Sequence, residues 1–167
     1  ILMQAGLYLT DTRGFAAPDA LPCYERAESL CHSLNRPLVL FSALRGLWRY
    51  SLTTDKLSAT MQIAKRVYSL AQDQNRATPT WIARLDSALM MGAYRALACT
   101  LYYSGDFETA REYAMRGIEI WRSGGVQSSV EEVTAPAVTC LCYEAMLQWH
   151  FREIPSCRAT MAEAISL

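Results

Sequence analysis

Residues 102–120 read YYSGDFETAREYAMRGIEI, and this stretch decides the fold. An apolar helical pattern runs up to Gly105. A glycine at the end of such a pattern can adopt the left-handed backbone conformation that stops a helix. Asp106 can accept hydrogen bonds from the first N–H groups of the next helix, and the Phe107 ring can fill the joint between the two helices. The stretch therefore predicts a tight antiparallel helical hairpin.

Small residues follow the turn at steps of four and three positions, at Ala110, Ala114 and Gly117. Side chains with this spacing share one face of a helix, so we expect a partner backbone to approach closely along that face. None of these side chains is reactive. The stretch thus predicts helix packing and no reaction centre.

Sequence segments similar to the second helix of this hairpin recur along the chain. One equivalent position in these segments is occupied by Cys23, Thr60, Ala110 and Cys157. Recurrence of this kind is typical of helical repeat proteins. An apolar helical pattern precedes each copy, and strand patterns are nearly absent. The sequence predicts an all-α domain of seven to eight antiparallel helices spanning residues 1–167. The first helices of the pairs are expected at about residues 1–12, 37–53, 79–104 and 131–151.

Helix boundaries carry their own signals. Pro37 suits the first turn of a helix, where its missing N–H costs nothing, and Thr78 suits an N-cap. Ser128 and Glu131 have the spacing of a capping box. Residues 122–129, RSGGVQSS, predict a loop.

Composition excludes several classes of protein. With 167 residues, of which 51% are hydrophobic, the chain can bury a core and is not disordered. Sixteen basic residues balance sixteen acidic ones, so no electrostatic footprint for nucleic acid or an anionic membrane is present. The richest apolar run, residues 87–103, contains Arg95 and is too short to span a bilayer. We expect a cytosolic protein with neither nucleic acid nor membrane as a partner.

Both ends of the sequence, ILMQAGLYL and MAEAISL, are apolar segments with a helical pattern and without helix-capping residues. The chain therefore reads as a fragment of something longer. Uncapped terminal repeats expose core faces, so self-association through these ends is expected.

No residue set with catalytic or metal-binding spacing is evident. Cys140 and Cys142 lie two apart on a helical pattern and point to different sides, so structural thiols are favoured over zinc ligands. Cys31 and His32 are adjacent, which does not give the facing geometry of an activated nucleophile. Gly124 lies in no phosphate-binding motif. We expect no enzyme activity, cofactor or metal.

One helix pair has an aromatic residue, a leucine, a small residue, a large residue, a turn glycine, an aromatic residue, a small residue and an apolar residue in this order, from Tyr94 to Ile118. With this order the pair resembles the tetratricopeptide repeat (TPR), which implies a right-handed α–α superhelix, or solenoid. The neighbouring pairs depart from the motif. Trp48 stands where the motif has a small residue, Ser51 where it has a large one, and Asp55 and Arg152 replace the turn glycine. The residues that match the motif are Tyr94, Leu97, Ala98, Leu101, Gly105, Phe107, Ala110 and Ile118.

More closely, residues 12–31, 44–50 and 135–149 resemble the helical region that follows the ATPase module of large bacterial signalling proteins. In that group the ATPases are fused to nucleotidyl cyclases, serine/threonine kinases or winged-helix transcriptional regulators. The resemblance implies a regulatory scaffold, with catalysis in other domains.

The repeat register of the TPR family also implies a concave groove with a basic and aromatic lining. Arginine can clamp a carboxylate or phosphate, and aromatic rings offer rigid contact area. The groove could thus hold an acidic peptide or an anionic small molecule. The same side chains could instead be salt bridges and buried aromatics between stacked helices. The residues at these positions are Arg45, Arg49, Arg95, Tyr102, Tyr103, Trp149 and His150.

Two functions remain open on this basis. The first is a non-catalytic scaffold that binds a protein, a peptide or other domains of its own chain. The second is an effector-sensing domain whose groove binds an anionic or sugar ligand.

Overall fold

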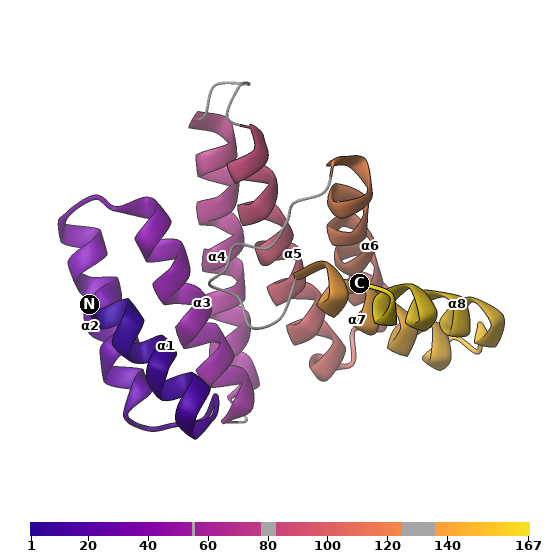
Figure 1. Ribbon diagram of the computed structural model, residues 1–167, viewed down its shortest axis with the longest axis horizontal. Helices are drawn as coiled ribbons and strands as arrows, with labels where there is room; N and C mark the ends of the chain where they lie inside the picture. Colours follow the sequence, from indigo (N-terminus) through magenta and orange to yellow (C-terminus); the bar gives the residue numbers. More distant parts are fainter. Residues whose placement is uncertain (55, 78–82, 125–135) are drawn as a thin grey trace. The chain divides into compact units, whose positions relative to one another are not determined.

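The structure, a computed structural model, describes residues 1–54, 56–77, 83–124 and 136–167. Within these residues every regular element is a helix, which confirms the all-α class (Figure 1). The described helices are α1 (Leu2–Arg13), α2 (Ala20–Ser33), α3 (Pro37–Thr53), α4 (Leu57–Ala77), α5 (Ala83–Ser104), α6 (Phe107–Gly124), α7 (Pro136–His150) and α8 (Ile154–Ile165).

The chain divides into two compact units, Ile1–Gln74 and Asn75–Leu167, and the boundary falls in the last turn of α4. In unit 1, α1 packs on α2 and α3, and α2 packs on α3. In unit 2, α5 packs on α6 and α7, α6 packs on α7, and α7 packs on α8. Each unit thus contains contacts between consecutive helices and between alternate ones. The expectation of a single repeat domain over residues 1–167 stays a prediction.

In unit 1 the buried ring of Tyr24 lies against two glycines. A Cβ atom on Gly46 of α3 would come within 2.4 Å of this ring, and one on Gly6 of α1 within 2.8 Å. The Tyr24 hydroxyl pairs with Thr10 Oγ1 at 3.0 Å. The two glycines therefore make room for a tyrosine that joins three helices.

A pair of buried hydroxyl groups links α3 to α4. Thr60 Oγ1 donates to Ser51 Oγ at 2.9 Å, and both side chains are buried. Trp48, one turn earlier on α3, is also buried in the core. Ser51 thus occupies a motif position for a large apolar residue, and Trp48 provides bulk one turn away.

In unit 2 the small-residue face of α6 behaves as expected. Ala110 and Ala114 are fully buried. A Cβ atom on Gly117 would come within 2.6 Å of Cys140 Sγ, so α6 and α7 approach closely at this point. The prediction of a close approach along this face is confirmed.

The turn after α5 confirms the hairpin expectation. Gly105 has φ 82°, and the N–H of Asp106 donates to the carbonyl of Leu101 at 3.1 Å, as in a Schellman helix end. Asp106 Oδ1 accepts from the N–H of Thr109 at 3.2 Å and so caps α6. The helix stop, the turn and the next helix start all lie where the sequence places them.

Two other helix ends use the same turn without glycine. Asn35 has φ 49° and Arg152 has φ 62°, each just after the end of a helix. The N–H of Glu153 donates to the carbonyl of Gln148 at 2.8 Å, which is the bond that Asp106 makes in its own turn. Arg152 therefore adopts the conformation of the turn glycine that it replaces. Asp55, the other replacement, lies outside the described residues.

Replacing Arg152 by Gly is expected to raise the free energy of unfolding by roughly 1 kcal/mol. The left-handed conformation destabilises a residue that has a Cβ atom by about 1 kcal/mol or more, and glycine lacks this cost. Urea unfolding followed by circular dichroism measures the change. Arg152→Ala, which removes the charge and keeps the Cβ atom, is the matched control and should give no gain. An equal gain in both variants would mean that the arginine side chain, not backbone strain, is responsible.

Some boundaries differ from the sequence-based expectation or are not tested. α3 begins at Pro37 as predicted. α6 continues to Gly124, whereas the sequence predicts that a loop begins at residue 122. The helix is at least three residues longer than predicted because Trp121, near its end, packs on the core. Thr78, Ser128 and Glu131 lie outside the described residues.

Candidate binding surface

Four aromatic side chains of unit 2 meet around Tyr102, and we call these five residues together the aromatic cluster. The ring centroid of Tyr102 lies 5.4–5.6 Å from those of Tyr103, Phe107, Tyr143 and His150. Phe107 stacks on His150 with centroids 4.3 Å apart, and Tyr102 Oη pairs with His150 Nε2 at 3.0 Å. The cluster joins the end of α5, the start of α6 and one face of α7.

Two local rules build this cluster. The turn at Gly105 reverses the chain, so that Phe107 at the start of α6 returns to Tyr102 in the last turn of α5. Tyr143 and His150 lie seven residues apart on α7, which is nearly two helical turns and places them on one face. Phe107 fills the joint as predicted, and α7 supplies the other side of that joint.

Arg111 of α6 ties the start of α8 to the rest of unit 2. Its Nη1 and Nη2 atoms donate to the two Glu153 carboxylate oxygens at 2.8 and 2.6 Å, and its Nε donates to Glu144 Oε1 at 3.0 Å. Its guanidinium lies 5.5 Å from the centroid of the Phe151 ring. A bidentate pair of this kind fixes orientation as well as distance. The turn between α7 and α8 is therefore held against α6.

The two carboxylates on Arg111 have opposite pKa shifts. Glu144 is buried and also accepts from Gln148 Nε2 at 2.9 Å. Burial raises the pKa of Glu144, and the charge of Arg111 opposes that rise. The hydrogen bonds from Arg111 lower the pKa of Glu153. Arg111 thus neutralises a carboxylate that burial would otherwise drive toward its protonated form.

Two members of the aromatic cluster, and two aromatic side chains next to it in the sequence, are open to solvent. Tyr103 is 54% exposed and Trp149 is 63% exposed. Phe151 and His150 are also exposed, whereas Tyr102 and Tyr143 are half-buried. We call Tyr103, Trp149, His150 and Phe151 the aromatic surface. Tyr103 lies at the C-terminal end of α5, and the other three side chains lie at or just after the C-terminal end of α7.

The structure brings three of the seven predicted groove residues together, namely Tyr102, Tyr103 and His150. Trp149 is the next-to-last residue of α7 and is exposed. Arg95 is only 2% exposed and lies in the interior of unit 2, where its charge acts on the buried thiol of Cys140. Its guanidinium is therefore not presented to solvent in this unit.

The two predicted arginines of α3 lie over aromatic rings within unit 1. The Arg49 guanidinium lies 4.7 Å from the centroid of Phe15, in the segment after α1, and burial lowers its pKa. The Arg45 guanidinium lies 5.8 Å from the ring centroid of Phe41, one turn earlier on α3. Both arginines therefore contact aromatic side chains of their own unit, and the prediction that they line a groove stays a prediction.

Sequence reasoning did not assign a site role to Tyr143, Arg111, Glu144 or Glu153. The seven-residue spacing of Tyr143 and His150 is a signal that could have paired them on one helix face. Arg111 and Glu153 are 42 positions apart, and no local pattern joins them.

The cysteines are free thiols, and three of the six, Cys31, Cys99 and Cys140, are buried. Cys99 Sγ–H donates to Tyr143 Oη at 2.8 Å. Burial raises the pKa of Cys99 to about 11 and that of Cys140 to about 12. Because the thiolate is the nucleophile, these two thiols are inert near neutral pH.

At pH 8 a thiol reagent is expected to modify Cys23 and Cys157 and to leave Cys99 and Cys140 unmodified in the folded protein. The first two side chains are partly exposed, and the other two are buried with raised pKa values. Mass spectrometry of the labelled peptides measures this, and labelling in urea serves as the control in which all thiols should react. Labelling of Cys140 as fast as Cys157 in the folded chain would contradict the assignment.

Among the described residues, no three histidine, cysteine or acidic side chains gather in a way that would hold a metal ion. No helix in the described ranges combines the length and the apolar character needed to cross a membrane. Comparison with protein-family models, with curated proteins and with solved structures finds no significant match for this chain.

Proposed function

We propose that this chain is a non-catalytic interaction module that binds an acidic peptide segment, either of a partner protein or of another domain of its own chain. The observation that carries the proposal is the aromatic surface, in which Tyr103 and Trp149 are more than half exposed and Tyr103 and His150 belong to the packed aromatic cluster. Tyrosine and tryptophan are common among the residues that dominate protein interfaces.

Contacts that hold the side chains of this surface in place favour a binding role. Arg111 fixes the turn that carries Phe151 through its bidentate pair with Glu153, and the Phe107–His150 stack fixes the end of α7. A rigid surface loses little conformational entropy when it binds. The exposed Arg152 next to Phe151 provides positive charge, which favours an acidic segment.

The proposal extends to the arrangement of the helices. Contacts between alternate helices, α1 with α3 and α5 with α7, are those that stacked helix pairs make in a TPR-like right-handed solenoid. We place such a module in a larger cytosolic bacterial signalling or transcription-regulating ATPase. This context rests on the sequence resemblance of residues 12–31, 44–50 and 135–149.

Selection of a displayed random-peptide library on the immobilised 167-residue chain tests the proposal. Enriched peptides are expected to be acidic with apolar anchors and to bind with micromolar Kd. Tyr103→Ala combined with Trp149→Ala is expected to weaken them at least about tenfold, because aromatic anchors at interfaces commonly contribute 2 kcal/mol or more, with roughly 1.4 kcal/mol per tenfold change. Fluorescence anisotropy of a labelled peptide measures the affinity.

Tyr8→Ala is the matched control, since Tyr8 is an exposed tyrosine of unit 1. It should leave peptide affinity unchanged. Equal affinity for the double variant and the native chain would show that the aromatic surface is not the site. Gel filtration of the same samples reads out the self-association that we also propose, and a monomer at all micromolar concentrations would contradict that part.

A second candidate, an effector-sensing domain, is favoured by a separate observation. Unit 1 contains a cavity of about 270 Å³ lined by apolar and charged side chains. The sequence-based form of this candidate places an anionic or sugar ligand on Arg45, Arg49 and Arg95. Since the first two lie over phenylalanine rings and the third is buried, the cavity supports this candidate better than those arginines do.

A further inference from the structure

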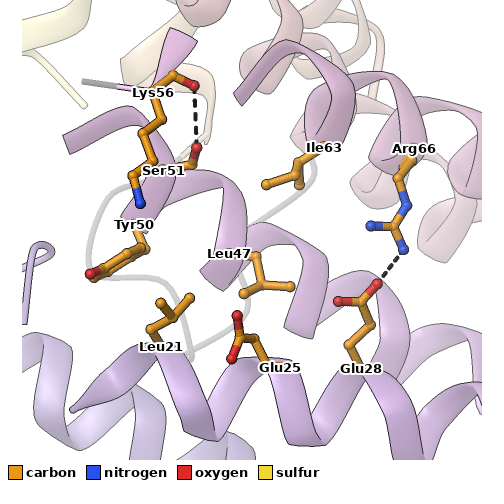
Figure 2. Close-up of a pocket in the computed structure, with 9 residues that line it drawn as sticks. All are labelled: Leu21, Glu25, Glu28, Leu47, Tyr50, Ser51, Lys56, Ile63 and Arg66. Atoms are coloured by element: carbon orange, nitrogen blue, oxygen red, sulfur yellow. Dashed lines mark hydrogen bonds and ion pairs between the residues drawn. The ribbon is translucent and has the colours of Figure 1, made fainter. Parts of the chain in front are cut away.

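The cavity of unit 1 lies between α2, α3 and α4 (Figure 2). Its apolar wall is made by Leu21 of α2, Leu47 of α3 and Ile63 of α4. Leu47 is buried and the other two side chains are half-buried, so the wall is continuous with the core of the unit. A hydrocarbon group placed here would leave water and contact three helices.

Charged side chains of both signs surround this wall. Arg66 of α4 forms an ion pair with Glu28 of α2 across one side of the cavity (Figure 2). These two charges neutralise each other. Glu25, one turn earlier on α2, and Lys56, just before α4, also line the cavity. Among the side chains drawn in Figure 2, neither the Glu25 carboxylate nor the Lys56 ammonium makes a hydrogen bond or an ion pair.

The corner between α3 and α4 sets the position of Lys56. Ser51 Oγ donates to the backbone carbonyl of Lys56 at 3.4 Å, and the N–H of Lys56 donates to the carbonyl of Ser51 at 3.2 Å. Tyr50, which also lines the cavity, precedes Ser51 in α3. The cavity therefore receives a cation and a phenol from this corner, and it receives a carboxylate from α2.

The size of the cavity limits what it can hold. A volume of about 270 Å³ equals roughly nine water molecules at about 30 Å³ each. It lies just below the range of about 300–1,000 Å³ that is usual for drug-sized ligands. A molecule of amino-acid size matches this volume.

We propose that this cavity binds a small zwitterion with an apolar side chain, of the size and chemistry of an apolar amino acid. Glu25 binds its ammonium group, Lys56 and the Tyr50 hydroxyl bind its carboxylate, and the apolar wall covers its side chain. Glu25 and Lys56 are both exposed at the edge of the cavity, and a zwitterion offers each of them a group of opposite charge, whereas a ligand with one charge can pair with only one of them. The site lies in unit 1 and is independent of the aromatic surface.

Binding also has a consequence for stability. The ligand would contact side chains of α2, α3 and α4 at once, and a molecule that binds only the folded state stabilises it. Unit 1 is thus expected to unfold at a higher temperature when the cavity is occupied. That change is the signal through which such a site could regulate attached domains.

Titration calorimetry of the 167-residue chain with L-leucine, L-methionine and L-phenylalanine tests the proposal. At least one of the three is expected to bind and to raise the melting temperature. Isoamylamine, which is leucine without its carboxylate, and 4-methylpentanoate, which is leucine without its ammonium, should each bind at least about tenfold more weakly, as loss of a charge-assisted hydrogen bond predicts. Failure of all three amino acids to bind at millimolar concentration, or equal binding of either one-charge analogue, would overturn the proposal.

Variants assign the roles of the side chains. Glu25→Gln and Lys56→Gln should each weaken amino-acid binding about tenfold, and Ile63→Trp should abolish it by filling the cavity. Glu119→Gln and Lys65→Gln are matched controls, because both side chains are exposed and neither lines the cavity. Circular dichroism melts without ligand confirm that each variant folds. If Glu25→Gln binds the amino acid as tightly as the native chain, or if the control variants lose as much affinity, the assigned roles are wrong.

Discussion

Replacing Arg111 by Met is expected to lower the free energy of unfolding by roughly 3–5 kcal/mol at pH 7. Arg111 is the charge partner of Glu144, which is buried, and the substitution leaves that carboxylate in the core with only Gln148 as a donor. An uncompensated buried charge costs far more than the net gain from a typical ion pair. Urea unfolding followed by circular dichroism and tryptophan fluorescence measures the loss.

The loss in Arg111→Met should shrink as the pH falls from 8 toward 4.5. Burial already raises the pKa of Glu144, and removing Arg111 takes away the charge that opposes this rise. A carboxyl whose pKa is higher in the folded state favours folding increasingly as it becomes protonated. In the native chain, Glu153 has a lowered pKa, so its contribution is present above its ordinary pKa and declines in acid. Both effects bring the variant and the native chain closer at low pH.

Arg116→Met is the matched control for this prediction. Arg116 is on the same helix, is about half exposed and pairs with Glu112 at 3.9 Å. Exposed pairs of this kind contribute about 0.3–0.5 kcal/mol, so the variant should differ little from the native chain. Adding Glu144→Gln to Arg111→Met removes the buried charge and should recover part of the stability. A loss in Arg111→Met that does not depend on pH would show that packing, and not the charge of Glu144, is responsible.

Replacing Gly46 by Ala is expected to lower the free energy of unfolding by roughly 1–3 kcal/mol, the usual cost of overpacking a core. Helix propensity alone predicts the opposite sign, a gain of about 1 kcal/mol. The new Cβ atom would come within 2.4 Å of the Tyr24 ring, and that ring already lies close to Gly6 of α1. The ring cannot move away without separating α1 from α2.

A double-mutant cycle isolates this steric effect. In a Tyr24→Leu background the ring is absent, so Gly46→Ala should be neutral or stabilising. The difference between the two backgrounds, measured by urea unfolding, gives the coupling energy between positions 24 and 46. Equal effects in both backgrounds would mean that the Tyr24 ring does not limit the space at Gly46.

Much of the fold could be predicted from local rules. Gly105, Asp106 and Phe107 act where the sequence places them, since a helix stop, a cap and a turn depend on residues a few positions apart. Pro37 begins α3 for the same reason. The predicted end of α6 was less accurate, because the packing of Trp121 on the core extends the helix into the segment whose composition predicts a loop.

The candidate site was predicted only in part. Tyr102, Tyr103 and His150 meet in one cluster, and the prediction that they line a concave groove stays a prediction. Arg95 and Arg49 have the residue type of groove ligands, yet Arg95 is buried and Arg49 lies over Phe15. Residue type and register do not indicate how deeply a side chain is covered by helices from other parts of the chain.

The sequence by itself determined that this protein is helical, where its clearest turn lies and which face of α6 packs closely. These properties follow from hydrogen bonds and side-chain spacing within a few residues. Only the tertiary structure decided that Arg111 meets Glu144 and Glu153, that Tyr24 lies between two glycines, and that Glu25 and Lys56 share a cavity. Burial and charge pairing depend on segments far apart along the chain, and no local pattern encodes which of them come together.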